Sequence, residues 1–299
     1  MVSYDDVWRV DFRLHCFTNG KLSCSVLPVC TADGKEIGAT SAEPAAGVEG
    51  LLTVIITSSP VRSNPSTRML SECIASLDRN AGLSKCRKLI MCDGFKVRQR
   101  SLRKQGVVTD EEAELYCTYV RNVARLCRED PAFRRTRLVR LARRQGSAYA
   151  IREALEAHVR TPFVLIIPHD CVIARPLKLA DLVAAMHGQP ERIRYVKLPG
   201  RSTAHYADAV HAQYGVRLRP SMDILPGATL TPMLRYMDNA AVVSVGYLRE
   251  KVFVPGSGVR RGTFIEDTYG KQTQVRPSLV APCDGRTRND SPLLCFSEY

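Results

Sequence analysis

An apolar run at residues 163–167 constrains the fold of this chain more than any other stretch. The run is rich in Val, Ile and Phe and predicts a strand that is buried on both faces, as the central strands of helix-covered sheets are. Pro168 cannot donate a backbone hydrogen bond and marks the end of this strand. His169 and Asp170 follow at the carboxyl end, where open α/β sheets bind their ligands. Two interpretations stay open: a site at this edge, or an Asp170 that only caps the next turn.

Two further apolar segments extend the pattern to a βαβ unit. Residues 51–57 predict a buried strand that runs into Ser58-Ser59-Pro60, and residues 88–92 predict a second strand that ends at Asp93-Gly94. Asn64-Pro65 supplies an N-cap and first-turn signal for a helix between the two strands. Apolar residues then recur at the spacing of one helix face: Met69, Leu70, Cys73, Ile74 and Leu77. This order predicts a parallel strand pair with a right-handed crossover.

Helices and strands continue to alternate further along the chain. Thr109 and Glu112 have the spacing of a capping box. The helix after them is expected to bury one stripe of side chains: Leu115, Tyr119, Val123 and Leu126. Strands are expected at residues 138–141, 193–198 and 241–245, and helices around Ile151 and at residues 177–186. Residues 199–236 show no clear pattern and stay unassigned.

The ends of the chain differ in composition from its middle. Asn19-Gly20 separates two short mixed runs and is a strong signal for a β-hairpin. Residues 38–50, rich in Ala, Gly, Glu and Pro, look like a linker. We therefore expect a small N-terminal β extension with its linker over residues 1–50, a main α/β domain over residues 51–275, and a C-terminal tail over residues 276–299.

The charge of the chain favours anionic partners. Lys and Arg number 43 against 30 Asp and Glu, a formal net charge of +13, and much of the excess lies in residues 85–152. Such a charge attracts phosphorylated or polyanionic ligands, although a solvated basic face is the plainer interpretation. A module that binds nucleic acid would rest on this charge alone. With aromatic residues at only 7%, stacking platforms for bases are not indicated, and nucleic acid is an unfavoured partner.

The cysteines and the hydropathy pattern bear on localisation. Eleven cysteines are scattered through the chain without CxxC spacing, which favours buried free thiols over a disulfide framework or a zinc site. Residues 1–14 are charged, and no run approaches 18 apolar residues, so the sequence predicts neither a signal peptide nor a membrane span. The cytoplasm is favoured, and the lumen of the secretory pathway stays an alternative.

Taken in order, these motifs resemble those of the GT-A fold glycosyltransferases, most nearly the inverting, family 2-like enzymes. The resemblance covers about residues 51–275 and implies a GT-A (Rossmann-like) α/β fold, with a mixed, mostly parallel sheet flanked by helices. It also implies that the chain moves a sugar, with inversion, from a nucleotide-sugar donor to an acceptor. In such enzymes the loop of the first strand and the Asp after the second strand hold the nucleoside. The matching residues are Thr57, Ser59, Pro60 and Asp93.

The resemblance also assigns a metal and a catalytic base. The Asp-x-Asp metal motif of the family falls on Pro168-His169-Asp170, so only its last carboxylate is kept, with His169 as a second candidate ligand for Mn²⁺ or Mg²⁺. Glu266-Asp267 matches the family's acidic pair, in which the Asp is the catalytic base; a helix N-terminal acidic pair is the alternative. Arg260 and Arg261, in a glycine-rich loop at residues 255–262, could bind the diphosphate.

Two other function classes and several identities stay open. A nucleotidyltransferase usually has a Gly-rich basic loop after its first strand, whereas residues 58–66 contain one Arg and no Gly. A non-enzymatic, basic polyanion-binding module is the second alternative. The sequence names neither the sugar nor the base of the donor, and the acceptor is a glycan, a protein or a small molecule.

Overall fold

The computed structural model describes residues 47–80, 82–200, 203–218, 221–225, 228–273 and 293–297. The expected N-terminal β extension lies outside the described residues, apart from residues 47–50, and so does most of the expected C-terminal tail. Within these ranges, no helix is both long and apolar enough to cross a bilayer. The domain boundaries at residues 50 and 275 stay predictions.

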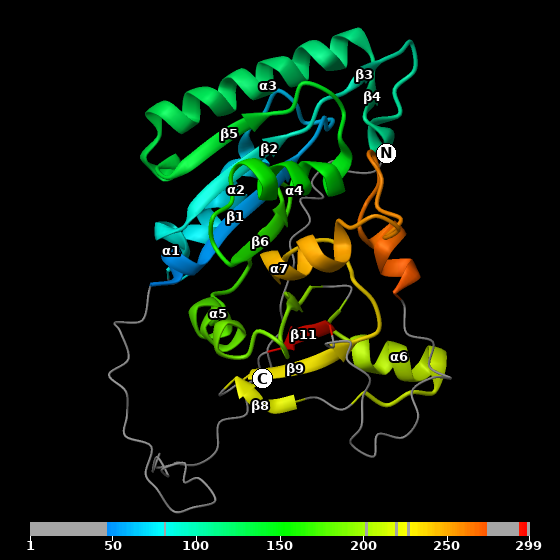
Figure 1. The fold of residues 1–299 in the computed structure, drawn as a ribbon. Coiled ribbons are helices and arrows are strands. Elements are labelled where there is room, and N and C mark those ends of the chain that lie inside the picture. The colour runs from blue at the N-terminus through cyan, green and yellow to red at the C-terminus, as the bar shows by residue number, and fades with distance from the viewer. Residues whose placement is uncertain are drawn as a thin grey trace, which may run out of the picture.

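A nine-stranded mixed sheet forms the centre of the molecule, in the order β5-β2-β1-β6-β10-β7-β11-β9-β8. Its first four strands are parallel and lie side by side in Figure 1: β5 (Thr136–Arg140), β2 (Arg87–Cys92), β1 (Leu52–Ser58) and β6 (Phe163–Pro168). Ile55 pairs with Leu89 on one side and Ile166 on the other. The apolar runs form central strands because both faces are covered, and each fully buried aliphatic side chain contributes roughly 1.5–3 kcal/mol.

The remaining strands make the sheet mixed. β10 (Ala241–Ser244) runs antiparallel to both β6 and β7 (Tyr195–Lys197). Beyond them lie β11 (Leu293–Ser297), β9 (Ala228–Met233) and β8 (Ser221–Leu225), so a segment of the expected tail adds a strand to the sheet. The region that the sequence left unassigned holds β8, β9 and α6 (Tyr206–Tyr214). A separate pair is formed by β3 (Lys96–Val97) and β4 (Val107–Val108).

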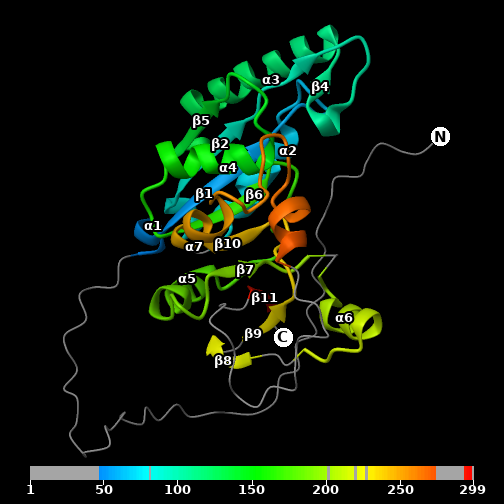
Figure 2. The same ribbon diagram turned by 45° about the vertical axis from the view of Figure 1, so that its right-hand side comes forward.

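Helices cover both faces of the sheet (Figures 1 and 2). On one face α2 (Arg68–Asp78), α3 (Asp110–Glu129) and α5 (Leu179–Gly188) bury their apolar stripes in one core cluster with side chains of β1, β2 and β6. On the other face lie α4 (Gly146–Ala157), α7 (Val245–Tyr247), η4 (Leu248–Val252) and η5 (Glu266–Gly270). The short elements are α1 (Val48–Leu51), η1 (Leu83–Lys85), η2 (Arg103–Gln105) and η3 (Pro131–Phe133). This arrangement confirms the predicted α/β fold with a mixed, mostly parallel sheet flanked by helices.

Two local predictions for the helices need correction. The helix after β1 begins at Arg68 with Thr67 as its N-cap, so Asn64-Pro65 lies in the preceding turn and is not the cap. In α3 the capping box is confirmed, because the Thr109 hydroxyl accepts from the Glu112 N–H at 3.3 Å. Its buried face is rotated, however, and Leu115 is 37% exposed. The buried stripe contains Ala113, Tyr116, Tyr119, Val120 and Val123.

Candidate active site

The predicted site residues lie where parallel strands end at one edge of the sheet. Thr57 is in register with Pro168 and Ser58 with Cys92, so the segments that follow β1, β2 and β6 leave the sheet side by side. Asp93 begins the segment after β2, and His169-Asp170 begin the segment after β6. Ser59 is exposed and Pro60 is buried in the segment after β1. The loops of this carboxyl edge therefore gather the residues that the sequence assigned to the donor and the metal.

A cleft of about 130 Å³ opens between α3 and the segments that follow β2 and β5. Its lining residues are Asp93, Gly94, Phe95, Tyr116, Cys117, Val120, Arg140, Leu141 and Ala142. The rings of Phe95 and Tyr116 meet edge to face, with centroids 5.8 Å apart. Arg140 is exposed at the end of β5 and brings a guanidinium to the cleft. The sequence singled out only Asp93 here, because the other lining residues look like ordinary helix and strand positions.

The carboxylate of Asp93 is bonded to the backbone on both oxygens. Its Oδ1 accepts from the N–H of Gly94 at 2.9 Å and of Gln145 at 2.7 Å, and its Oδ2 accepts from the N–H of Gly146 at 2.9 Å. Burial raises the pKa of this carboxyl, while the three N–H donors and the Arg144 guanidinium oppose the rise. Asp93 therefore joins the end of β2 to the turn that begins α4.

His169 packs toward the core rather than into solvent. Only 5% of the residue is exposed, its ring centroid lies 6.4 Å from that of Tyr119 on α3, and its Nδ1 is 3.3 Å from the Thr57 carbonyl oxygen. Burial lowers its pKa, an effect that the charge of Asp170 partly offsets, so the imidazole is neutral near pH 7. Its buried Nε2 has no hydrogen-bond partner among the described residues. Asp170 itself is half-buried in the turn after β6.

The basic loop predicted at residues 255–262 packs against the segment after β5. The Gly262 N–H donates to the Gln145 carbonyl oxygen at 2.6 Å, and the Arg144 guanidinium donates to the Gly262 carbonyl oxygen at 3.1 Å. Arg260 and Arg261 are exposed. The Arg261 guanidinium carbon lies 5.8 Å from the centroid of the Tyr149 ring in α4. The two arginines thus stand above the amino-terminal end of α4.

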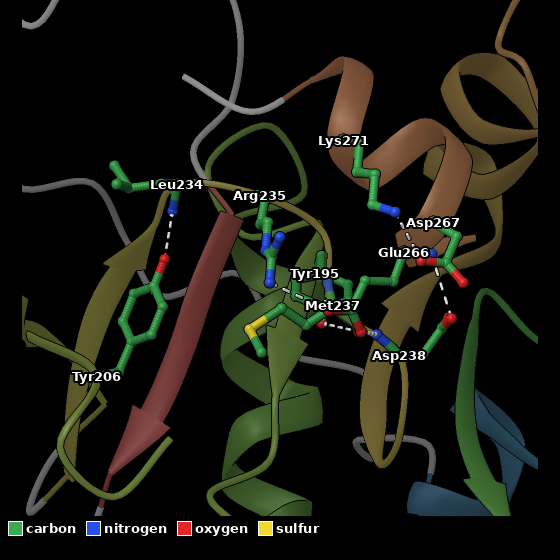
Figure 3. Close-up of polar contacts among 9 residues, drawn as sticks. All are labelled: Tyr195, Tyr206, Leu234, Arg235, Met237, Asp238, Glu266, Asp267 and Lys271. Atoms are coloured by element: carbon green, nitrogen blue, oxygen red, sulfur yellow. Dashed lines mark hydrogen bonds and ion pairs between the residues drawn. The ribbon is translucent and has the colours of Figure 1, made fainter. Parts of the chain in front are cut away.

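Glu266 and Asp267 open the π-helical turn η5 and differ in their surroundings (Figure 3). Glu266 Oε1 accepts from Arg235 at 3.3 Å, and its Oε2 accepts from the Asp238 N–H at 3.1 Å. Asp267 has a side chain that is 58% exposed, with Oδ1 3.0 Å from the Lys271 ammonium nitrogen. Glu266 is therefore held by hydrogen bonds from Arg235 and Asp238, whereas the carboxylate of Asp267 faces outward.

Asp238 is a carboxyl group at the site that the sequence did not single out. Its Oδ2 accepts from the Glu266 N–H at 3.2 Å, so the two residues exchange a pair of hydrogen bonds (Figure 3). Burial raises its pKa to about 7, and the charges of Glu266 and Asp267 add to the rise. Asp238 lies just before β10, which is antiparallel to β6, and hence at the same carboxyl edge. An acid between Met237 and Asn239 resembles an ordinary turn residue, so no sequence pattern marks Asp238 as part of a site.

No protein-family model matches the chain, and no curated protein sequence matches it. Solved structures resemble parts of the chain at low identity and with TM-scores below 0.5. A 1–349 fragment of TarS from S. aureus is 10% identical, with a TM-score of 0.43, over 76% of this chain and 56% of that one. The mannosyltransferase PcManGT from Pyrobaculum calidifontis, in complex with GDP-Man and Mn²⁺, is 15% identical with a TM-score of 0.42, over 71% and 49%.

A third solved structure is GalNAc-T7 with UDP, GalNAc and Mn²⁺. It is 10% identical with a TM-score of 0.47, over 82% of this chain and 41% of that one. The match thus spans between 41% and 56% of the lengths of these three proteins. Likeness at this level assigns no role to any residue of this chain.

Proposed function

We propose that this chain is a glycosyltransferase that moves a sugar from a nucleoside-diphosphate sugar to an acceptor hydroxyl, with inversion at the anomeric carbon. One observation carries the proposal: the cleft beside Asp93, the turn with Asp170 and the segment with Glu266 and Asp267 all lie at the carboxyl edge of one sheet. These motifs follow one another along the chain in the same order as in the inverting GT-A enzymes that the sequence resembles.

The donor's nucleoside would occupy the cleft. Phe95 and Tyr116 offer apolar surface to a base, and Arg140 offers N–H donors to its carbonyl groups. Thr57, Ser59 and Pro60 would border the ribose from the segment after β1. Arg260 and Arg261 are the exposed cations that would meet the diphosphate.

A divalent cation would be shared between the chain and the donor. Among the described residues, no three His, Cys, Asp or Glu side chains gather into a metal centre. Asp170 would therefore hold Mn²⁺ or Mg²⁺ together with diphosphate oxygens and water. When bound, such an ion supplies positive charge that stabilises the leaving diphosphate. We assign His169 a packing role, because its ring is buried against Tyr119.

Asp267 would act as the general base. Its outward carboxylate can reach an acceptor hydroxyl, and Oδ2 is not the oxygen that pairs with Lys271. As the hydroxyl oxygen forms its bond to the anomeric carbon, the bond from that carbon to the diphosphate oxygen breaks on the opposite face. The hydroxyl proton passes to Asp267. Attack and departure on opposite faces invert the configuration.

Thermal unfolding with nucleotides tests the donor and metal assignments. UDP, GDP, CDP and ADP are each added with and without Mn²⁺, and a ligand at about a hundred times its dissociation constant should add roughly 2.7 kcal/mol of stability. We expect one diphosphate to raise the Tm in a metal-dependent way, and Asp170→Ala to abolish the metal-dependent part. Asp181→Ala, in the exposed first turn of α5, is the matched control and should keep it. No shift with any diphosphate would contradict the proposal.

The base assignment is tested by replacing Asp267 with Asn. We expect Asp267→Asn to lower sugar transfer by about a hundredfold or more, since it removes the proton acceptor. The same variant should bind the diphosphate normally. Asp110→Asn, an exposed acid in the first turn of α3, is the control and should transfer at the wild-type rate. If Asp267→Asn kept most of its activity, another residue would be the base.

A further inference from the structure

A chain of short hydrogen bonds joins the cleft to the segment that carries Glu266 and Asp267. Asp93, which lines the cleft, accepts from the N–H of Gln145 at 2.7 Å. The carbonyl oxygen of the same Gln145 accepts from the N–H of Gly262 at 2.6 Å. Glu266 follows Gly262 by four positions in the chain. One residue, Gln145, thus connects a cleft carboxylate to the loop that leads into η5.

Glycines allow these three segments to touch backbone to backbone. A Cβ on Gly94 would lie 2.3 Å from the carbonyl carbon of Arg143. A Cβ on Gly146 would lie 2.6 Å from the Cα of Gly262. Such contacts are far shorter than side chains tolerate, and Gly146 also has a φ of +75° that disfavours other residues. The hydrogen bonds therefore operate across a close-packed junction, in which a shift of one segment moves the others.

Hydrogen bonds between Arg260 and Thr263 close the turn at residues 260–263, which leads from the junction toward η5. The Thr263 hydroxyl donates to the Arg260 carbonyl oxygen at 2.7 Å and accepts from the Arg260 N–H at 3.2 Å. The Thr263 carbonyl oxygen in turn accepts from the N–H of Ala148 in α4 at 3.3 Å. The turn at residues 260–263 therefore follows the position of Gln145 and α4 as one piece.

We infer that Asp93 is a positioning residue: it holds the 258–267 segment, and with it Asp267, in place through Gln145 and Gly262. The inference deepens and rests on the proposed function, and it replaces the direct contact with the nucleoside that the sequence resemblance implied for Asp93. Both of its carboxylate oxygens accept hydrogen bonds from backbone N–H groups. These three hydrogen bonds hold segments of the protein together and do not involve a ligand. A donor bound in the cleft would contact the same junction that positions the general base Asp267.

Asp93→Asn tests the inference, because an amide group keeps one acceptor oxygen and turns an NH₂ toward backbone donors. We expect faster amide hydrogen exchange at residues 145–146 and 258–264, by about tenfold or more, the size of effect that fits loss of a hydrogen bond to a charged group. In sugar transfer, we expect kcat to fall by about tenfold while the donor KM stays within about threefold. Faster exchange is measured on the free protein, without any donor.

Gly146→Ala is the second variant and leaves Asp93 untouched. Its added methyl group collides with Gly262, so it should loosen residues 258–264 and lower kcat as Asp93→Asn does. This variant carries the test if Asp93→Asn fails to fold. Val123→Ala, which opens a cavity in α3 on the opposite face, controls for global loss of stability. Arg140→Ala should weaken nucleotide binding without changing exchange at residues 258–264.

The outcomes separate the inference from the proposed function. A tenfold higher donor KM for Asp93→Asn, with exchange at residues 258–264 as in the wild type, would show that Asp93 binds the nucleoside and overturn the inference. So would an equal increase in exchange for Val123→Ala at a matched loss of Tm. If no donor supports transfer by the wild-type chain, the proposed function fails, while exchange in the two variants still decides whether Asp93 positions the segment.

Discussion

At the scale of single residues, Asp238 should make the stability of the chain depend on pH. Its pKa is raised to about 7, first by burial, against about 3.9 for an unfolded Asp. The folded chain therefore keeps a proton between these values that the unfolded chain has lost. Stability from this group is complete below about pH 4 and declines as pH rises through 7. Asp238→Asn cannot ionise, so we expect its Tm relative to the wild type to rise from about pH 4 to about pH 7 and to level off above that.

The control for Asp238 is an acid of the same type in an exposed position. Asp181→Asn, on the surface of α5, should follow the wild-type pH profile of Tm. Differential scanning calorimetry between pH 4 and pH 8 gives both profiles. Equal profiles for the wild type and Asp238→Asn would mean that no charge is buried at this position.

Cys117 offers a second residue-scale test, because it lines the cleft and is only half-buried. A nucleotide in the cleft should cover its thiol. At about ten times its dissociation constant, the nucleotide should slow alkylation of Cys117 roughly tenfold. Cys127, further along α3 and with a pKa raised by burial, is the internal control and should react at an unchanged rate. Peptide mass spectrometry reads both sites in one sample. Unprotected Cys117, beside a nucleotide-induced rise in Tm, would place the nucleotide elsewhere.

At the scale of elements, the amino-terminal end of α3 is the best-specified boundary in the chain. Thr109 and Glu112 close a reciprocal capping box, and acidic residues fill the first turn. Thr109→Ala removes the side-chain acceptor and should cost about 1 kcal/mol of stability. Thr118→Ala, an identical change in the middle of α3, should cost little, since Ala favours helix interiors. Urea unfolding compares the two. Equal losses would show that the cap contributes nothing specific.

The same elements show what the sequence could and could not predict. β1, β2 and β6 fall within one residue of the predicted strands, because continuous burial on both faces leaves an uninterrupted apolar run. The face of α3 was predicted with a rotation, since Tyr116 and Val120 can be buried as Leu115 can, and only tertiary packing selects among them. β9 pairs with β11, about sixty residues further along, and this distant partner leaves no local pattern, whereas β8 pairs with the adjacent β9 through an irregular register.

Side-chain roles at the site were harder to predict than elements. Sequence spacing brought Asp93 and Asp170 to the carboxyl edge correctly, because parallel strands end together there. It gave no sign that the Asp93 carboxylate bonds three backbone N–H groups, since two of these donors lie more than fifty residues away. Asp238 has no sequence signal of its own, because its hydrogen-bond partner Glu266 lies 28 residues further along the chain. Contacts of this kind depend on tertiary structure and leave no local pattern.

At the scale of the whole molecule, two stretches of the chain contribute the cleft and the acidic groups beside Asp267, and the loops after β1 and β6 add the other site residues. The earlier stretch, from β2 to α4, supplies the cleft, and the later stretch, from Arg235 to η5, supplies the acidic groups. They meet at Gln145 and Gly262, on the face of the sheet that α4 and η5 cover. β5 and β8 are the two edge strands of the sheet, and Arg137, exposed on β5, does not line the cleft.

This separation allows salt to distinguish the transferase from a polyanion-binding module. Binding of nucleic acid through six to ten phosphate contacts would weaken by about 10³- to 10⁵-fold between 50 and 200 mM salt. A nucleoside diphosphate in the cleft engages few charges, and we expect its affinity to fall by less than about tenfold over the same range. Fluorescence anisotropy of a labelled single-stranded DNA and calorimetry of the diphosphate give the two slopes.

A charge reversal on the exposed edge strand completes the salt experiment. Arg137 is exposed on β5. Burial lowers the pKa of His158, and the charges of Arg137 and two other nearby arginines lower it further. Arg137→Glu should weaken DNA binding at low salt, because it inverts one charge of the basic face, and should leave diphosphate binding unchanged, because Arg137 does not line the cleft. DNA binding that persists at 200 mM salt, in a chain that no diphosphate stabilises, would instead make the basic face the functional surface.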